Sequence, residues 1–170
     1  MAFYLDLNTT TGRPGRVLPL TTSAGAADAG KIVQTNAAGQ LDGTLLPAGL
    51  GPDSVTVLTS VALTAGAQVN IFNNAGVANV RPAIATGIAT ESHGYVLAAF
   101  GAGVQATVFF DDNNTAVTAL TPGVQYLSAA TAGAVTITPP SAAGQIVQRI
   151  GVATSATSLH QSGSPESYLL

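Results

Sequence analysis

The chain has 170 residues, of which 46% are apolar and only 8% are charged, and its net charge is −3. A typical globular protein carries roughly 25% charged residues. The negative charge argues against nucleic acid as a partner, and the absence of cysteine excludes disulfides, thiolate metal sites and cysteine nucleophiles. A surface with few charges is poorly protected against association. We therefore expect partner subunits to cover much of it; the alternative is a small β domain that is simply soluble.

The N-terminal sequence, MAFYLDLNTTTGRPGR, lacks the basic segment and the following apolar run of a signal peptide. No stretch approaches the roughly 18 continuous apolar residues of a membrane-spanning helix. We therefore expect a soluble product with no membrane partner.

Residues 1–53 predict an extended N-terminal arm with a short hairpin and a linker. Pro14 and Pro19 each disfavour helix at the preceding residue, and a short helical piece is expected only near Ala24–Ala27. Two segments, KIVQT and QLD, have the pattern of short strands on either side of the turn NAAG. The segment PAGLGPD, residues 47–53, is typical of a linker.

Residues 54–160 predict an all-β domain, a compact β-sandwich or barrel of short antiparallel strands. Apolar and polar residues alternate in SVTVLTSVALT and AQVNIFNN, and further short strands follow between turns rich in Gly, Asn, Asp and Pro. No segment keeps a helical period over the length of a helix. The residues expected in the core are Val57, Val69, Ile71, Val96, Val108, Phe110, Val124, Tyr126, Ile137, Ile146 and Ile150.

Residues 161–170 are predicted to form a C-terminal tail. This segment is polar until Tyr168, Leu169 and Leu170. Apolar residues at a terminus either dock on a surface or belong to a frayed end. The sequence leaves both alternatives open.

Glu91, His93, Asp111 and Asp112 are the one ionisable cluster that the sequence suggests. The segment ESHG precedes one predicted strand and DDNN follows the next, so a hairpin would bring the two segments together. Such a group could bind a cation or orient the histidine. However, DDNN matches no calcium-loop spacing and is good turn chemistry by itself. A solvated loop is therefore expected, and no metal site is predicted.

Catalytic motifs are absent from the sequence. No serine lies in G-x-S-x-G, and the glycines form neither G-x-G-x-x-G nor a P-loop. We therefore expect no enzyme, no catalytic residue and no cofactor. Phe109 is either an interface residue or covered within the fold, and Arg81 and Arg149 either pair between subunits or face solvent.

Four segments resemble parts of phage structural proteins. AGKIVQTNAAGQLDGTLLP resembles a connector found near the start of many phage virion proteins. HGYVLAAFGAGVQATVFFDDNN, LTPGVQYLSAATAGAVTITPP and GQIVQRIGVATSATSL resemble a β module of phage capsid cement (decoration) proteins, which also occurs in tail-fibre-like proteins. The resemblance covers about residues 29–160.

This resemblance implies a virion structural protein that is made in the host cytoplasm and lies on the capsid exterior. Such a protein binds the major capsid protein and itself, usually as a trimer, and bridges neighbouring capsomers against the pressure of packaged DNA. The alternative is a structural protein of a tail fibre, baseplate or neck appendage. A carbohydrate-binding module ranks lower, because the chain has no Trp and only four Tyr for sugar stacking.

The residues expected to contact partners lie in the arm and its connector. An extended arm can add a strand to the edge of a partner's sheet, and a single hairpin is too small to be stable by itself in water. The candidate interface residues are Phe3, Tyr4, Leu5, Val17, Leu18, Leu20, Ile32, Val33, Leu41, Leu45 and Leu46.

Overall fold

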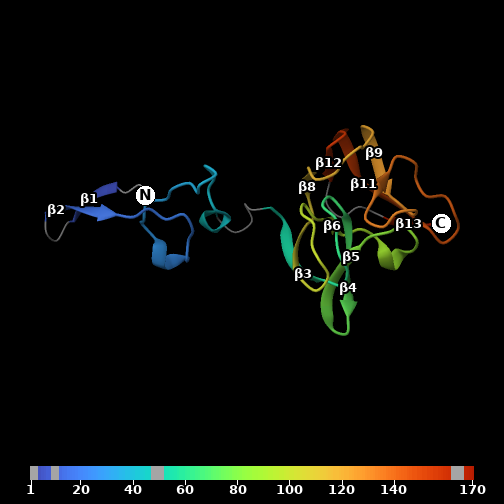
Figure 1. Ribbon diagram of the computed structural model, residues 1–170, viewed down its shortest axis with the longest axis horizontal. Helices are drawn as coiled ribbons and strands as arrows, with labels where there is room; N and C mark the ends of the chain where they lie inside the picture. The colour runs from blue at the N-terminus through green and yellow to red at the C-terminus, as the bar shows by residue number, and fades with distance from the viewer. Residues whose placement is uncertain (1–3, 9–11, 47–51, 162–166) are drawn as a thin grey trace. The chain divides into compact units, whose positions relative to one another are not determined.

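The computed structural model describes residues 4–8, 12–46, 52–161 and 167–170. The chain divides into two compact units, Met1–Gly51 and Pro52–Leu170, and the division lies within the linker expected at 47–53 (Figure 1). Within these ranges the chain forms three 3-10 turns of three residues each: η1 (Ala26–Asp28), η2 (Gly43–Leu45) and η3 (Ile88–Thr90). Among the described residues, no helix has the length and apolar character needed to cross a membrane.

The first unit contains a hairpin, but the hairpin lies earlier in the chain than the sequence suggested. Strands β1 (Tyr4–Asn8) and β2 (Arg13–Val17) pair antiparallel. The predicted strands KIVQT and QLD are not formed, so that prediction is wrong. Val33 instead makes a parallel bridge to Leu20. The side chain of Asn36 closes the following turn by accepting from the amides of Ala38 and Gln40, and the backbone N–H of Asn36 donates to the carbonyl oxygen of Gln40 at 2.8 Å.

The second unit, called the body below, begins with a closed five-stranded barrel. Its strands follow the order β3 (Ser54–Thr59), β5 (Val77–Pro82), β4 (Gln68–Asn74), β6 (Gly94–Tyr95) and β7 (Gln105–Phe109). All pairs are antiparallel, as expected, except the parallel pair β3–β5 that closes the barrel. Strands β6 and β7 approach closely at Gly94, where a Cβ would lie 2.3 Å from the carbonyl oxygen of Phe109.

A second sheet completes the body. Its order is β10 (Val135–Thr136), β9 (Gly123–Leu127), β11 (Ile146–Ser155), β12 (Ser158–Gln161) and β8 (Asp112–Asn114). The end of the chain forms β13 (Ser167–Leu169), which pairs with the first residues of β11. The C-terminus is therefore docked on the body rather than frayed. In Figure 1, β8, β9, β11 and β12 gather at one end of the body, and β3 and β4 lie toward the other. The fold is all-β, which confirms the predicted class.

Two hydrophobic cores lie inside the body, one in the barrel and one under the second sheet. Val57, Val69, Val96 and Val108 are buried in the barrel core, with Ile71 and Phe110 packed against it. The second core consists of Ala83, Ala85, Val117, Leu127, Ile146, Ile150, Ala153 and Leu159. Most of the predicted core residues are therefore confirmed.

Two residues assigned to the core are exposed instead. Val124 lies on the outer side of β9, opposite Val152 of β11. Ile137 follows the last residue of the two-residue strand β10 and is 55% exposed. Tyr126 is half-buried on the same outer side as Val124. The alternation of side chains along β9 correctly separated its two faces, but it did not show which face the core covers.

A buried polar bridge joins the two cores. The amide side chain of Gln148 in β11 accepts from the backbone N–H of Ser92 at 2.7 Å and donates to the carbonyl oxygen of Ser92 at 2.8 Å. The hydroxyl of Ser92 donates in turn toward Oε1 of Gln68 in β4, at 2.9 Å. All three residues are buried. Side chains thus provide, between barrel and sheet, the hydrogen bonds that a strand pair would make.

Replacing Gln148 by alanine is expected to destabilise the body strongly. The Gln148→Ala change removes both bonds to Ser92 and leaves a buried N–H and a buried carbonyl without these partners, a loss of about 3 kcal/mol in the free energy of unfolding. Urea unfolding measures this change. The control is Gln105→Ala at an exposed position of β7, which should alter the free energy by less than about 0.5 kcal/mol. Equal stability of the two variants would contradict a structural role for the bridge.

Candidate interaction surface

Residues 18–46, which follow the N-terminal hairpin and are called the connector below, are held by short polar contacts within the segment. The carboxylate of Asp28 accepts from Lys31 Nζ at 2.7 Å and from the amide of Ala24 at 2.6 Å. The bond from Lys31, followed by that from Ala24, lowers the pKa of Asp28. The backbone here is therefore fixed by hydrogen bonds rather than by a core.

Thr44 ties the two ends of the connector together. Asp42 caps η2 by accepting from the hydroxyl and the amide of Thr44, at 2.7 and 3.0 Å, and these two bonds lower the pKa of Asp42. The hydroxyl oxygen of Thr44 also accepts from the amide of Ser23 at 2.8 Å, across 21 positions of sequence. The connector is thus a loop closed on itself by polar groups.

Apolar side chains of this unit lie on its surface. Leu5 is 73% exposed, Leu18 57% and Leu41 53%. Ile32, Val33 and Leu46 are also exposed, and Leu20 and Leu45 are half-buried. Tyr4 and Val17 are members of β1 and β2, and Phe3 lies outside the described residues. Of the residues before 47 whose burial is described, none is buried.

The exposed residues of the connector and hairpin define what we call the arm surface: Leu5, Leu18, Ile32, Val33, Leu41 and Leu46. A held backbone with apolar side chains turned to solvent is typical of a binding surface. None of these side chains offers an acid, a base or a metal ligand. The surface can therefore bind another apolar surface, but it supports no reaction.

The ionisable cluster suggested by the sequence is only partly assembled. His93 Nε2 lies 3.5 Å from the carboxylate of Glu91, and Glu91 also accepts from the hydroxyl of Ser167 in β13. Nδ1 of His93 accepts from the backbone N–H of Ile71 at 3.0 Å. Within the described ranges, no three His, Asp or Glu side chains lie close enough together to hold a metal ion.

Tyr95 and Phe109 form a stacked aromatic pair inside the body. Their ring centroids are 5.7 Å apart, and the hydroxyl of Tyr95 donates to the carbonyl oxygen of Asp111 at 2.9 Å. Burial, together with the negative charges of Asp112 and Asp111, raises the pKa of Tyr95 to about 12. Phe109 is half-buried, with its ring stacked on that of Tyr95.

Arg81 has its partners within the body. Its Nε donates to Asn70 Oδ1 and its Nη2 to the carbonyl oxygen of Ala89, both at 3.0 Å. The guanidinium also lies 4.3 Å from the centre of the Phe72 ring, a cation–π contact. Arg149, in contrast, is exposed on β11.

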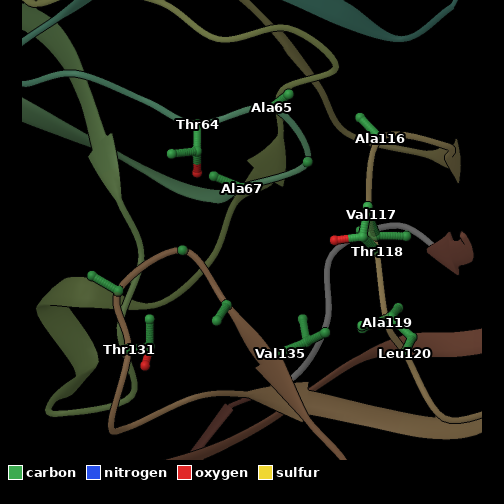
Figure 2. Close-up of a pocket in the computed structure, with 14 residues that line it drawn as sticks. Thr64, Ala65, Ala67, Ala116, Val117, Thr118, Ala119, Leu120, Thr131 and Val135 are labelled. Atoms are coloured by element: carbon green, nitrogen blue, oxygen red, sulfur yellow. The ribbon is translucent and has the colours of Figure 1, made fainter. Parts of the chain in front are cut away.

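A hollow of about 360 Å³ opens between three loops of the body. Residues 64–67, 116–120 and 131–135 line it, and Figure 2 shows that small side chains and threonine hydroxyls surround it. The lining contains no charged and no aromatic side chain. The hollow therefore offers no group for acid–base chemistry and no ring on which a sugar could stack.

Comparisons with protein-family models, with curated proteins and with solved structures find no match for this chain.

The raised pKa of Tyr95 predicts a late step in an alkaline titration. The folded pKa exceeds the ordinary value near 10, so neutral Tyr95 stabilises the fold below pH 10, and this contribution is lost between pH 10 and about 12. Tyrosinate absorbance should show one of the four tyrosines ionising near pH 12. The late step should vanish in Tyr95→Phe; its persistence would assign it to another tyrosine.

Removal of residues 1–51 is expected to leave the body folded. Both hydrophobic cores lie in Pro52–Leu170, so the arm contributes little to the stability of the body. Thermal unfolding followed by circular dichroism should give the shortened chain a melting temperature within a few degrees of that of the full chain. Failure of residues 52–170 to fold alone would show that the arm supplies part of the core.

Proposed function

We propose that this protein is a virion structural protein, a capsid cement (decoration) protein that binds the outer surface of a phage head and bridges capsomers to stabilise the shell. The proposal rests on one property of the first unit, the exposure of its apolar side chains. Its backbone is held by hydrogen bonds, yet the apolar side chains of the arm surface have no core to enter. An arm built in this way needs a partner, and the self-sufficient body leaves it available for one.

Binding through the arm surface would be driven mainly by the hydrophobic effect. Full burial of one leucine side chain contributes about 1.5–3 kcal/mol. Leu18, Leu41 and Leu46 would together offset much of the entropy lost when two molecules associate. Because the loop is already held by Asp28 and Asp42, less of this gain is spent on ordering it. The major capsid protein and sister copies of this chain are the proposed partners.

The hairpin adds a second means of attachment. Strand β1 is paired only with β2 among the described residues, so its other edge can join a partner's sheet through backbone hydrogen bonds. In β2, Pro14 lacks a backbone N–H. This proline makes β2 the poorer edge for such pairing. The proposed attachment therefore combines strand addition at β1 with burial of the connector leucines.

The number of copies in the particle tests the proposal directly. A cement protein covers the shell, so quantitative mass spectrometry of purified particles should find this chain in an amount similar to that of the major capsid protein. Particles lacking the chain should also release their DNA at a lower temperature. Only a few copies per particle would favour a tail or neck appendage, and absence from the particle would refute a virion role.

Changing leucines of the arm surface should abolish incorporation without unfolding the body. In the triple variant Leu18→Ser, Leu41→Ser and Leu46→Ser, loss of apolar burial should lower binding to particles that lack the protein by about a hundredfold or more. The matched control is Val61→Ser, Val77→Ser and Ile88→Ser, at body positions of similar exposure. Sedimentation with particles measures binding. Equal binding of the two triple variants would contradict the arm as the attachment site.

A further inference from the structure

The second sheet of the body turns one face toward the core and the other away from it. Gln125, Leu127, Ile150 and Leu159 are buried on the inner face. On the opposite side, β9, β11 and β13 contribute half-buried or exposed side chains that we call the outer face. They are Val124, Tyr126, Val147, Arg149, Val152 and Tyr168.

Strand register brings these six side chains together in pairs. Val152 lies opposite Val124, and Arg149 opposite Tyr126, where β11 runs beside β9. Val147 lies opposite Tyr168, where β11 runs beside β13. Directly opposite residues on one face of a sheet have their Cβ atoms about 5 Å apart. The outer face is therefore a surface of valine and tyrosine around a single arginine. It is bordered by Thr136 of β10, opposite Tyr126, and by the exposed His160 of β12, opposite Val152.

This composition is characteristic of protein interfaces. Tyrosine and arginine are the residues, with tryptophan, that contribute most binding energy at contacts between proteins. The body has two arginines, and Arg81 is already bonded to Asn70 and Ala89. Arg149 has no carboxylate within ion-pair distance among the described residues, where the ion pairs are Lys31–Asp28 and His93–Glu91. The outer face thus presents a cation that lacks an anion.

The complementary charge lies at an edge of the same sheet. Asp111 and Asp112 are exposed, and Asp112 begins β8, the edge strand that pairs with β12. No cation lies within ion-pair distance of Asp112 in the described part of the chain. Its Oδ1 accepts from the backbone amide of the next residue, Asn113, at 2.8 Å. The body as a whole carries five carboxylates against two arginines, and Asp112 is the carboxylate at the start of this edge strand.

We infer that the outer face binds a second copy of this chain, with Arg149 of one copy on Asp112 at the β8 edge of the next. The two surfaces are different, so the contact is heterologous, and repeated copies close into a ring when the rotation between them allows it. The valines and tyrosines supply burial, while the charge pair fixes the register of the two sheets. The inference deepens the proposed function by naming the contact that would join copies on a shell.

Charge exchange tests this contact on the purified full chain, without any particle. Sedimentation velocity should show the wild type as an oligomer at micromolar concentration. Arg149→Asp alone and Asp112→Lys alone should each weaken association by about tenfold or more, because each places like charges together. The double variant should recover association. The control Asp53→Lys changes an exposed carboxylate elsewhere in the body and should associate as the wild type does.

A second measurement covers the case in which a charge variant fails to fold. Asp112 has a φ of 85°, in the left-handed region, so lysine there is under strain and folding must be checked by circular dichroism. Since the chain contains no cysteine, one preparation carrying Arg149→Cys can be mixed with another carrying Asn113→Cys. Mild oxidation should link the two chains to each other in preference to like chains.

Three results would overturn the inference: a monomeric wild type, single charge variants that associate like the wild type, or cysteine chains that do not link in preference to like pairs. None of these depends on a phage particle. Failure here would therefore leave the copy-number test of the cement role intact, and failure of that test would leave the ring contact standing.

Discussion

Among the residues whose burial is described, the first buried side chain is that of Val57. The second unit therefore has a hydrophobic core, whereas the described part of the first unit has no buried side chain. Ordering a chain costs conformational entropy, which burial of apolar surface normally offsets. In the first unit the offset comes from local hydrogen bonds at Asp28, Asn36 and Asp42. These fix the loop but leave its leucines in water. The missing apolar burial is what a partner would supply.

The body is organised so that its sites of association are few. The barrel β3–β5–β4–β6–β7 is closed by short pairings, β3–β5 at Leu58 and Thr59 and β4–β6 at Gln68 and Val69, and paired edges are not open to another chain. The second sheet remains open at β8 and β10. Because Ser92 is bonded to both Gln68 and Gln148, the sheet is held firmly to the barrel. A rigid body with one open sheet and a separate apolar arm suits a protein that binds neighbours in a repeating array.

The sequence predicted the all-β class and most of the barrel core, because alternation with period two is the main signal of a half-buried strand. In the second sheet it placed Ile146 and Ile150 of β11 correctly in the core. It did not predict which face of β9 is covered, because Val124 alternates like a core residue but lies on the outer face. The hairpin was misplaced because the β-propensity of a five-residue segment does not decide which segment it pairs with. Val33 pairs with Leu20 instead of with the segment QLD. The arm residues could be identified as interface candidates, but a chain read alone contains no information on its partner.

A partner is expected to cover the arm surface. A cryo-EM reconstruction of the particle that carries this protein, at a resolution that shows side chains, would test this most directly. We expect Leu18, Leu41 and Leu46 to lie buried against the major capsid protein or a neighbouring copy. A map in which these three leucines remain in solvent, while the body alone contacts the shell, would contradict it.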